Sequence, residues 1–145
     1  MEVPANLHSV PIVFKASLVP VAKAAADSGD DSDFSRLHPA TPAKRGFVAY
    51  FIRYELPASA FAAKTVDGHP QIEFDLATVD FNQLGEEVSQ NGQRVHLTFS
   101  VDNPTQPVRV EQQIDLKKGD NYLSLAVWNT VTRSLGALEV PITVK

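Results

Sequence analysis

Apolar side chains occupy every second position in several stretches of this chain, a pattern that predicts β-strands rather than helices. The first stretch spans residues 10–18, where the apolar even positions would form one buried face: Val10, Ile12, Phe14, Ala16 and Leu18. The second spans residues 47–56 and repeats the pattern with Val48, Tyr50, Ile52, Tyr54 and Leu56. Because Phe47, Ala49 and Phe51 are also apolar, we expect the start of this second strand to be covered on both faces, as is typical of a central strand.

The third stretch changes phase. Its apolar residues fall at even positions from Ile72 to Leu76 and at odd positions from Val79 to Phe81. Alternation cannot change phase without an extra residue, so the sequence predicts a β-bulge near Ala77 or Thr78.

Turn signals separate the strands that follow. Residues 82–85 predict a turn, and Asn91-Gly92 predicts a tight hairpin turn before a strand that begins near Val95. Further alternating stretches cover residues 108–116, 122–131 and 137–144, and a polar turn at 117–121 separates the first two. Pro141 lies inside the last stretch. Since proline has no N–H for a ladder, this strand is predicted to lie at a sheet edge or to carry a bulge.

These stretches together predict an all-β fold, an antiparallel immunoglobulin-like β-sandwich of seven or eight strands in a single domain over residues 1–145. A chain of 145 residues can bury about 68–70% of its unfolded surface, so it needs no disulfide or structural metal. Residues 58–64 are expected to form at most a short helical turn.

One segment, residues 22–46, has no apolar period and is rich in Ala, Ser, Asp and Pro. Such a composition cannot bury enough apolar surface to offset the ordering entropy of its backbone, about 1–2 kcal/mol per residue. We therefore expect a long mobile loop between the first two strands, either functional or a tolerated insertion.

The composition excludes several classes of function. The chain has no cysteine, which excludes a disulfide scaffold, a thiolate zinc site, an iron–sulfur cluster and a cysteine nucleophile. Its net charge of −4 argues against nonspecific binding to nucleic acid or to an anionic membrane, and no stretch is long and apolar enough to insert into one. The first six residues lack the basic and apolar regions of a signal peptide, so we expect either a cytoplasmic protein or a domain of a longer exported chain.

Candidate metal ligands and catalytic groups are few. Four carboxylates lie within residues 27–33, at Asp27, Asp30, Asp31 and Asp33. Their spacing does not match an EF-hand, so a solvated acidic loop is expected, with calcium binding as the alternative. The histidines lack ligand spacing: His8, His38, His69 and His96. With no nucleophile elbow and no glycine-rich phosphate loop, the sequence predicts no catalytic residue, no metal and no cofactor.

Aromatic side chains are the remaining candidates for contact with a ligand or a partner. Trp128, the only tryptophan, and Tyr122 share one parity and point away from the apolar line of Leu123, Leu125 and Val127. Burial of these two rings by the long loop or by a neighbouring domain is the favoured interpretation. Exposed aromatics on a sandwich face can also stack against sugars, so a carbohydrate-binding surface built from Trp128, Tyr122, Tyr50 or Tyr54 is the alternative.

The C-terminal half carries a family resemblance. Residues 116–129, LKKGDNYLSLAVWN, form a glycine-tyrosine turn and strand, and Ser134-Leu135-Gly136-Ala137 leads into a last strand with Val140-Pro141. This run, with residues 72–88, resembles the C-terminal region of bacterial, chiefly acidobacterial, proteins that carry a von Willebrand factor A-related domain. The likeness covers residues 48–144. It implies an accessory β-sandwich at the end of a larger exported or cell-surface protein. In that family the upstream A-type domain would hold any metal-dependent adhesion site, and its Asp-x-Ser-x-Ser ligands have no counterpart in this sequence.

Residues and resemblance together predict a non-catalytic structural or protein-interaction module, extracellular, periplasmic or at the cell surface. Its partner would be another protein or a neighbouring domain, reached by surface recognition or by pairing of an edge strand, which could also support a weak homo-oligomer. The alternative is a module that binds carbohydrate or another small ligand. An enzyme is the least favoured class, because the sequence shows no assembled set of acid, base and nucleophile.

Overall fold

The computed structural model of the chain describes residues 12–26, 34–37, 40–57, 64–66, 69–98, 107–129 and 133–145. These ranges contain nine strands and one short helix. In chain order they are β1 (Lys15–Pro20), α1 (Val21–Ala26), β2 (Ser35–Arg36), β3 (Phe47–Leu56), β4 (Lys64–Val66), β5 (His69–Asn82), β6 (Glu87–Thr98), β7 (Val108–Lys117), β8 (Gly119–Asn129) and β9 (Ser134–Val144).

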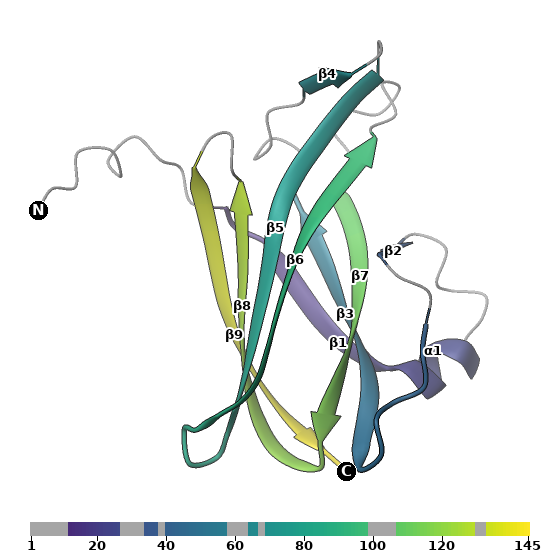
Figure 1. The fold of residues 1–145 in the computed structure, drawn as a ribbon, viewed down its shortest axis with the longest axis vertical. Helices are drawn as coiled ribbons and strands as arrows, with labels where there is room; N and C mark the ends of the chain where they lie inside the picture. The colour runs from purple at the N-terminus through teal and green to yellow at the C-terminus, as the bar shows by residue number, and fades with distance from the viewer. Residues whose placement is uncertain are drawn as a thin grey trace, which may run out of the picture.

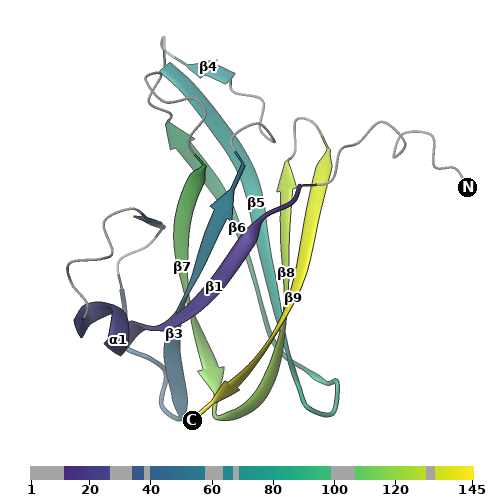
Figure 2. The same ribbon diagram turned by 180° about the vertical axis from the view of Figure 1, so that it is seen from behind.

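The strands form two sheets around a common interior (Figure 1). Sheet A has the order β1-β3-β7-β2 and lies toward the viewer in Figure 2, with α1 at one end of β1. Sheet B has the order β4-β5-β8-β9, and β6 also pairs with β5. The described pairings are antiparallel except that of the two-residue β2, which runs parallel to β7. The structure therefore confirms the predicted all-β class with two facing sheets.

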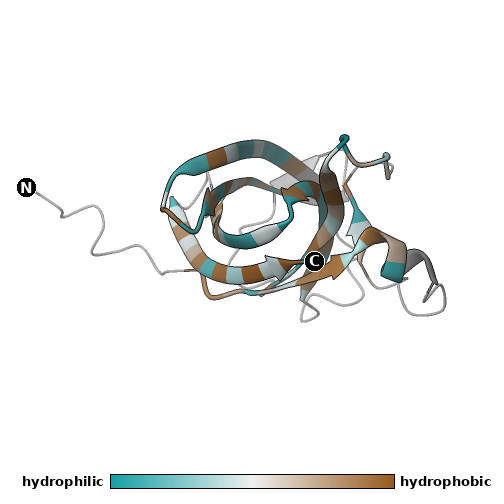
Figure 3. Cartoon of the chain, turned by 90° about the horizontal axis from the view of Figure 1, so that it is seen from below, coloured by the Kyte–Doolittle hydropathy of each residue, from teal (hydrophilic) through white to brown (hydrophobic). Residues whose placement is uncertain are grey.

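The core lies between the sheets and follows the predicted alternation, visible as alternating brown and teal along the strands in Figure 3. The largest of its fully buried side chains come from both sheets: Ile52, Tyr54, Leu56, Ile72, Phe74, Leu76, Leu116, Leu123 and Leu125. Burying an aliphatic or aromatic side chain of this size stabilises a fold by about 1.5–3 kcal/mol. Ile12 and Phe14, just before β1, are buried in the same core.

The prediction that the second strand is central and covered on both faces is correct. β3 pairs with β1 on one side and with β7 on the other. Ile52 faces the core, while its neighbour Phe51 points to the opposite face and is still only 1% exposed. The guanidinium carbon of Arg36 lies 4.6 Å from the centroid of the Phe51 ring, so chain from the 34–46 region covers this outer face.

The last strand lies at a sheet edge, as Pro141 predicts. Among the described residues β9 pairs in a ladder with β8 alone, where Pro141 lies opposite Tyr122. One further bond reaches its start, where the backbone N–H of Ile12 donates to the carbonyl oxygen of Leu135 over 3.2 Å. The chain packs so closely here that a Cβ on Gly136 would overlap the carbonyl oxygen of Ile12.

The predicted bulge near Ala77 or Thr78 is wrong. Even positions keep facing the core past Leu76, since Thr78 and Asp80 are also buried. The ladder between β5 and β6 shifts register only between Asp80 and Phe81, where Val88 of β6 is the extra residue. The phase of the strand is constant, and only the polarity of its inward positions changes.

The predicted tight turn at Asn91-Gly92 is also wrong. Both residues lie inside β6, opposite Thr78 and Ala77. Gly92 does not have the positive φ that the tight hairpin turn requires, whereas Gly85 does, with a φ of 79°. The chain turns at the predicted 82–85 signal instead, where the Asn82 side-chain oxygen accepts from the backbone N–H groups of Leu84 and Glu86.

The prediction of one long structureless loop over residues 22–46 needs correction within its described parts. Most of α1 and all of β2 lie there. With β2 and the equally unpredicted short strand β4, the described residues contain nine strands instead of the predicted seven or eight. The physical reason is a set of long-range polar anchors to β7, described below, which the local composition does not reveal. Residues 58–63, expected to form a helical turn, lie outside the described residues, and Lys64 begins β4.

No helix in the described ranges has the length and apolar character needed to cross a membrane.

Candidate functional site

A cleft of about 600 Å³ opens between β6 and β7, the facing edges of the two sheets. One wall comes from the polar ends of β5 and β6, and the other comes from Ile114 and Leu116 of β7. Within the described residues β6 pairs with β5 alone, and the ladder of β2 on β7 reaches only Val110 and Glu111. The cleft therefore lies where the two sheets are not joined by backbone pairing.

The polar wall consists of two successive cross-strand pairs. Thr78 lies opposite Asn91, and Asp80 lies opposite Ser89. Directly opposed residues of an antiparallel ladder project their side chains to the same face. Since Thr78 and Asp80 continue the buried even face of β5, the side chains of Ser89 and Asn91 also belong to the inner face. All four line the cleft.

Asp80 is the most unusual side chain of this wall. It is 2% exposed, and its Oδ1 is buried without a hydrogen-bond partner among the described residues. Burial raises the pKa of the Asp80 carboxyl from its ordinary value of 3.8 to about 6. Near neutral pH the group is therefore largely ionised in a place where a carboxylate is poorly solvated, and such a group gains from any donor or cation that reaches it.

A chain of side-chain hydrogen bonds meets the cleft at Thr78. The Tyr54 hydroxyl lies 3.4 Å from Oγ1 of Thr78 and donates to Oε1 of Gln112 over 3.3 Å. Gln112 in turn donates from Nε2 to Oε1 of Gln93 over 3.1 Å. Burial raises the pKa of Tyr54 to about 12, so this hydroxyl stays protonated and available as a donor at physiological pH. The bonds join β3, β5, β6 and β7 and fix Thr78 in position.

The mouth of the cleft carries both signs of charge. Lys44, Asp115 and Lys117 are its charged lining residues besides Asp80. The backbone N–H of Lys44 donates to Oδ2 of Asp115 over 3.2 Å. Nζ of Lys117 lies 5.8 Å from the centroid of the Phe47 ring, which is a cation–π contact. Among the described residues none of these cations forms an ion pair with Asp80.

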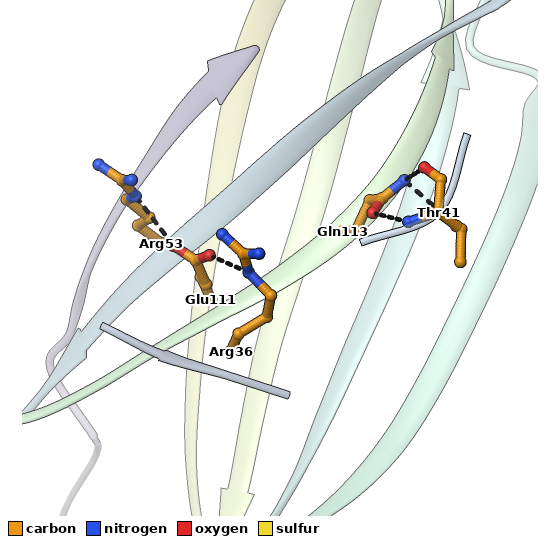
Figure 4. A network of polar contacts seen from close by, with 5 residues as sticks. All are labelled: Arg36, Thr41, Arg53, Glu111 and Gln113. Atoms are coloured by element: carbon orange, nitrogen blue, oxygen red, sulfur yellow. Dashed lines mark hydrogen bonds and ion pairs between the residues drawn. The ribbon is translucent and has the colours of Figure 1, made fainter. Parts of the chain in front are cut away.

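A second polar cluster lies on the outer face of sheet A and serves a structural role (Figure 4). The Glu111 carboxylate accepts from Nε of Arg36 over 2.8 Å and from Nε of Arg53 over 3.2 Å. Nearby, the side chain of Gln113 exchanges hydrogen bonds with the backbone N–H and carbonyl oxygen of Thr41. These bonds anchor the chain around residues 36–44 to β7 and so bring Thr41 and Lys44 to the cleft.

Glu111 and Asp80 make an informative contrast. Both are nearly inaccessible to solvent, with exposed fractions of 1% and 2%. Glu111 is compensated by two arginines, which is how a buried carboxylate normally persists. Asp80 has no such compensation among the described residues. Oδ1 of Asp80 is therefore the buried acceptor that is available to a ligand.

The structure separates the four aromatic residues singled out from the sequence. Tyr50 and Tyr54 belong to the core between the sheets. Tyr122 is 47% exposed, and Trp128 is half-buried, both on the outer face of sheet B. Six residues along one strand span about 20 Å, so Tyr122 and Trp128 are too far apart to stack on one sugar ring. The four rings do not meet at one surface.

The other sequence candidates fall outside what the structure describes. Asp27, Asp30, Asp31, Asp33, His8 and His38 lie outside the described residues, and the side chains of His69 and His96 are not described. Among the residues that are described, no group of three or more His, Cys, Asp or Glu side chains could hold a metal ion.

Sequence reasoning missed Thr78, Asp80, Ser89 and Asn91. One signal could have found the first two. If the even phase of residues 72–76 is simply continued, positions 78 and 80 are inward and polar, which marks an interior surface that is not packed with hydrocarbon. Placing the turn at residues 82–85 would not by itself find Ser89 and Asn91, because the extra residue Val88 is what brings them opposite Asp80 and Thr78.

Comparisons with known proteins leave the family open. No protein-family model matches the chain, and no curated protein matches it. Among solved structures, it is similar to a Bordetella pertussis protein described as a candidate ApaA protein, with 12% identity and a TM-score of 0.32 over 93% of this chain and 92% of that one. A score this low carries no argument about fold or activity.

Proposed function

We propose that this chain is a non-catalytic binding module whose cleft between β6 and β7 receives a small polar ligand. The observation that carries the proposal is the unpartnered Oδ1 of Asp80. Leaving a buried acceptor unsatisfied costs about 1–3 kcal/mol, and native proteins rarely tolerate it without a reason. A ligand donor in the cleft would remove that cost.

The size and lining of the cleft support this proposal. Ligand sites commonly enclose about 300–1,000 Å³ and combine apolar walls with a few converging polar groups. The cleft has a volume of about 600 Å³, with Ile114 and Leu116 facing the polar wall of β5 and β6. Among its described lining residues, Asp80 is the only buried ionisable group. Acid–base catalysis commonly uses an acid and a base positioned together, so a lining with one buried carboxylate favours binding over catalysis.

The test is a screen of small ligands by ¹H–¹⁵N NMR, with polyols, sugars, amides, amines and carboxylates at millimolar concentration. We expect at least one class to shift the amides of residues 78–80, 89–91 and 114–116 together. Asp80→Asn should weaken that binding, whereas Asp75→Asn, at an exposed pair on the other face, should not. If every binder shifts residues outside the cleft only, the proposal fails.

A second candidate function, a protein-interaction module, is supported by an apolar row on the outer face of sheet B. Phe81, Tyr122 and Pro141 lie side by side on three neighbouring strands, and Tyr122 is half-exposed. This row would pack against a neighbouring domain or a partner protein. It fits the proposal, which rests on the family resemblance, of an immunoglobulin-like accessory domain in a larger exported bacterial protein.

The second candidate has its own test. In the full gene product, hydrogen exchange around Tyr122 and Pro141 should be slower than in this chain alone if a neighbouring domain covers the row. Equal exchange rates in the two proteins would show that no neighbouring domain of the same chain covers this row.

A further inference from the structure

Resting on the proposed function, we propose a ligand class for the cleft: an aliphatic primary amine whose ammonium group binds Asp80 and whose far end is neutral or acidic. The argument uses the charge balance of the protein, the acceptors on the polar wall, the apolar wall and the mouth.

The charge balance favours a cationic ligand. Three carboxylates in the described part of the chain form ion pairs with arginine: Glu111 with Arg36 and Arg53, Glu55 with Arg109, and Asp75 with Arg94. Asp80 is more deeply buried than Glu55 or Asp75 and has no cationic partner among the described residues. A buried carboxylate is stabilised most by an opposite charge brought into hydrogen-bond contact. A neutral donor would satisfy Oδ1 without balancing the charge.

The acceptors around Asp80 favour an ammonium over a guanidinium. An ammonium carries three diverging N–H donors, whereas a guanidinium presents a planar fork that suits both oxygens of one carboxylate. Asp80 and Ser89 form one cross-strand pair, and Thr78 and Asn91 form the next. They offer carboxylate, hydroxyl and amide oxygens at neighbouring ladder positions, which is a set of separate acceptors around a compact donor.

A metal ion fits this wall less well. Calcium takes six to eight oxygen ligands and is normally held by several carboxylates. The polar wall supplies one carboxylate, and no acidic cluster of metal-binding size occurs in the described part of the chain.

The apolar wall and the mouth define the rest of the ligand. Ile114 and Leu116 of β7 line the cleft opposite the polar wall and would contact an alkyl chain of the ligand. Lys44 and Lys117 line the same cleft and would repel a second positive charge at the far end of the ligand, while Asp115 already accepts from the backbone of Lys44. The cleft should therefore prefer a monoamine or an amino acid with a distant carboxylate to a diamine.

The experiment titrates the full chain with four probes of similar length, followed by NMR and calorimetry. We expect n-butylamine and 5-aminopentanoate to bind at the cleft, cadaverine to bind at least threefold more weakly than 5-aminopentanoate, and 1-butanol to leave the cleft amides unshifted. Asp80→Asn should lower amine affinity at least tenfold, and Asp75→Asn should leave it unchanged. A capped peptide with one lysine is a further arm: tighter binding of the peptide assigns the ammonium to a protein partner, and tighter binding of the free amines assigns it to a small molecule.

A pH series adds a readout that a purely structural role of Asp80 would not give. Because burial raises the pKa of Asp80 to about 6, amine affinity should fall by about tenfold per pH unit once the pH drops below that value. The other charged groups facing the cleft are Lys44, Asp115 and Lys117. To separate their titration from that of Asp80, the same pH series is run on Asp80→Asn, whose amine affinity should show no such fall.

The outcomes distinguish a wrong ligand class from a wrong proposed function. If 1-butanol binds as well as the amine, if calcium shifts the cleft amides where amines do not, or if Asp80→Asn keeps full amine affinity, the ligand class is wrong while the cleft remains a binding site. If neither these probes nor any compound of the wider screen shifts the cleft, both proposals fall.

Discussion

Asp80 lies directly opposite Ser89 in the β5–β6 ladder, and the next pair, Phe81 with Glu87, is out of step by one residue. The extra residue is Val88, which also lines the cleft. A bulge bends the strand that carries it and increases its local twist. The one irregularity of this ladder therefore lies directly beside the buried carboxylate, where it helps to set the angle of the polar wall.

Replacing Asp80 by Asn should stabilise the protein at neutral pH. The folded-state pKa of about 6 exceeds the ordinary 3.8, so the folded protein binds the proton more tightly than the unfolded chain does. This contribution to stability is present below about pH 4 and is lost as the pH rises through 6. We expect Asp80→Asn to gain on the order of 1–2 kcal/mol at pH 8, discounted because the cleft opens to water, and to equal the wild type near pH 4.

Urea unfolding at both pH values measures this difference. A variant less stable than the wild type at pH 8 would show that an ionised Asp80 is already well compensated in the folded protein.

Replacing Glu111 by Ala should destabilise the fold strongly. The change leaves Arg36 and Arg53 without their shared carboxylate, so that the chain near Arg36 is held to β7 only by backbone contacts such as the bond from the N–H of Leu37 to the carbonyl oxygen of residue 111. Breaking a buried ion pair costs about 3–5 kcal/mol, and the partial exposure of Arg36 places the expected loss near the lower end, about 3 kcal/mol. The matched control is Asp75→Ala at the exposed pair with Arg94, which should leave the unfolding midpoint nearly unchanged. Similar losses in the two variants would refute a structural anchor at Glu111.

Two glycine substitutions should differ in their effect. In Gly136→Ala the new methyl group would overlap the carbonyl oxygen of Ile12, so the N-terminal segment has to shift, at a cost of about 1–3 kcal/mol. In Gly92→Ala the methyl group finds only the carbonyl oxygen of Leu76 at 4.0 Å, and φ is not positive, so stability should stay the same or rise slightly. Thermal unfolding of both variants decides the matter. A clear loss of stability in Gly92→Ala would instead support the tight turn that the Asn91-Gly92 pair predicts.

Removing two core hydroxyl groups should also give unequal results. Tyr54→Phe removes the donor to Gln112 and the neighbour of Thr78, for an expected loss of about 1 kcal/mol. Tyr50 is buried too, but its hydroxyl has no hydrogen bond to the described residues, so Tyr50→Phe should have little effect. Chemical denaturation of the two variants under one set of conditions makes the comparison. Equal losses would mean that the Tyr54 hydrogen bonds add nothing to stability.

Much of the fold follows from the two-residue period alone. Two stretches, residues 47–56 and 108–116, keep one parity throughout, and both form strands with the predicted buried faces. Their inward side chains are apolar except that of Gln112, which is polar and buried. Pro141 identifies an edge strand because its missing N–H is a local property. The anchoring of the 34–46 region could not be predicted, because Arg36 and Glu111 are 75 positions apart in the sequence and nothing local marks them as partners.

The two-residue period of apolar positions predicts the fold, but it misses the candidate site. Apolar Val79 and Phe81 suggested a phase change, since period reasoning assumes that inward positions are apolar. In the structure they lie on the outer face of sheet B, and polar Thr78 and Asp80 face inward. A polar interior wall breaks that assumption, so the sequence pattern fails at the candidate site.

The polar wall is built from strand positions rather than from a loop, and this has an evolutionary consequence. Ser89 and Asn91 are exposed to the cleft, so exchanging their side chains leaves the backbone frame and the apolar core intact. For the proposed ligand site this means that selectivity could change by point substitution at two neighbouring ladder positions, without the insertions and deletions through which loop-based sites usually diversify.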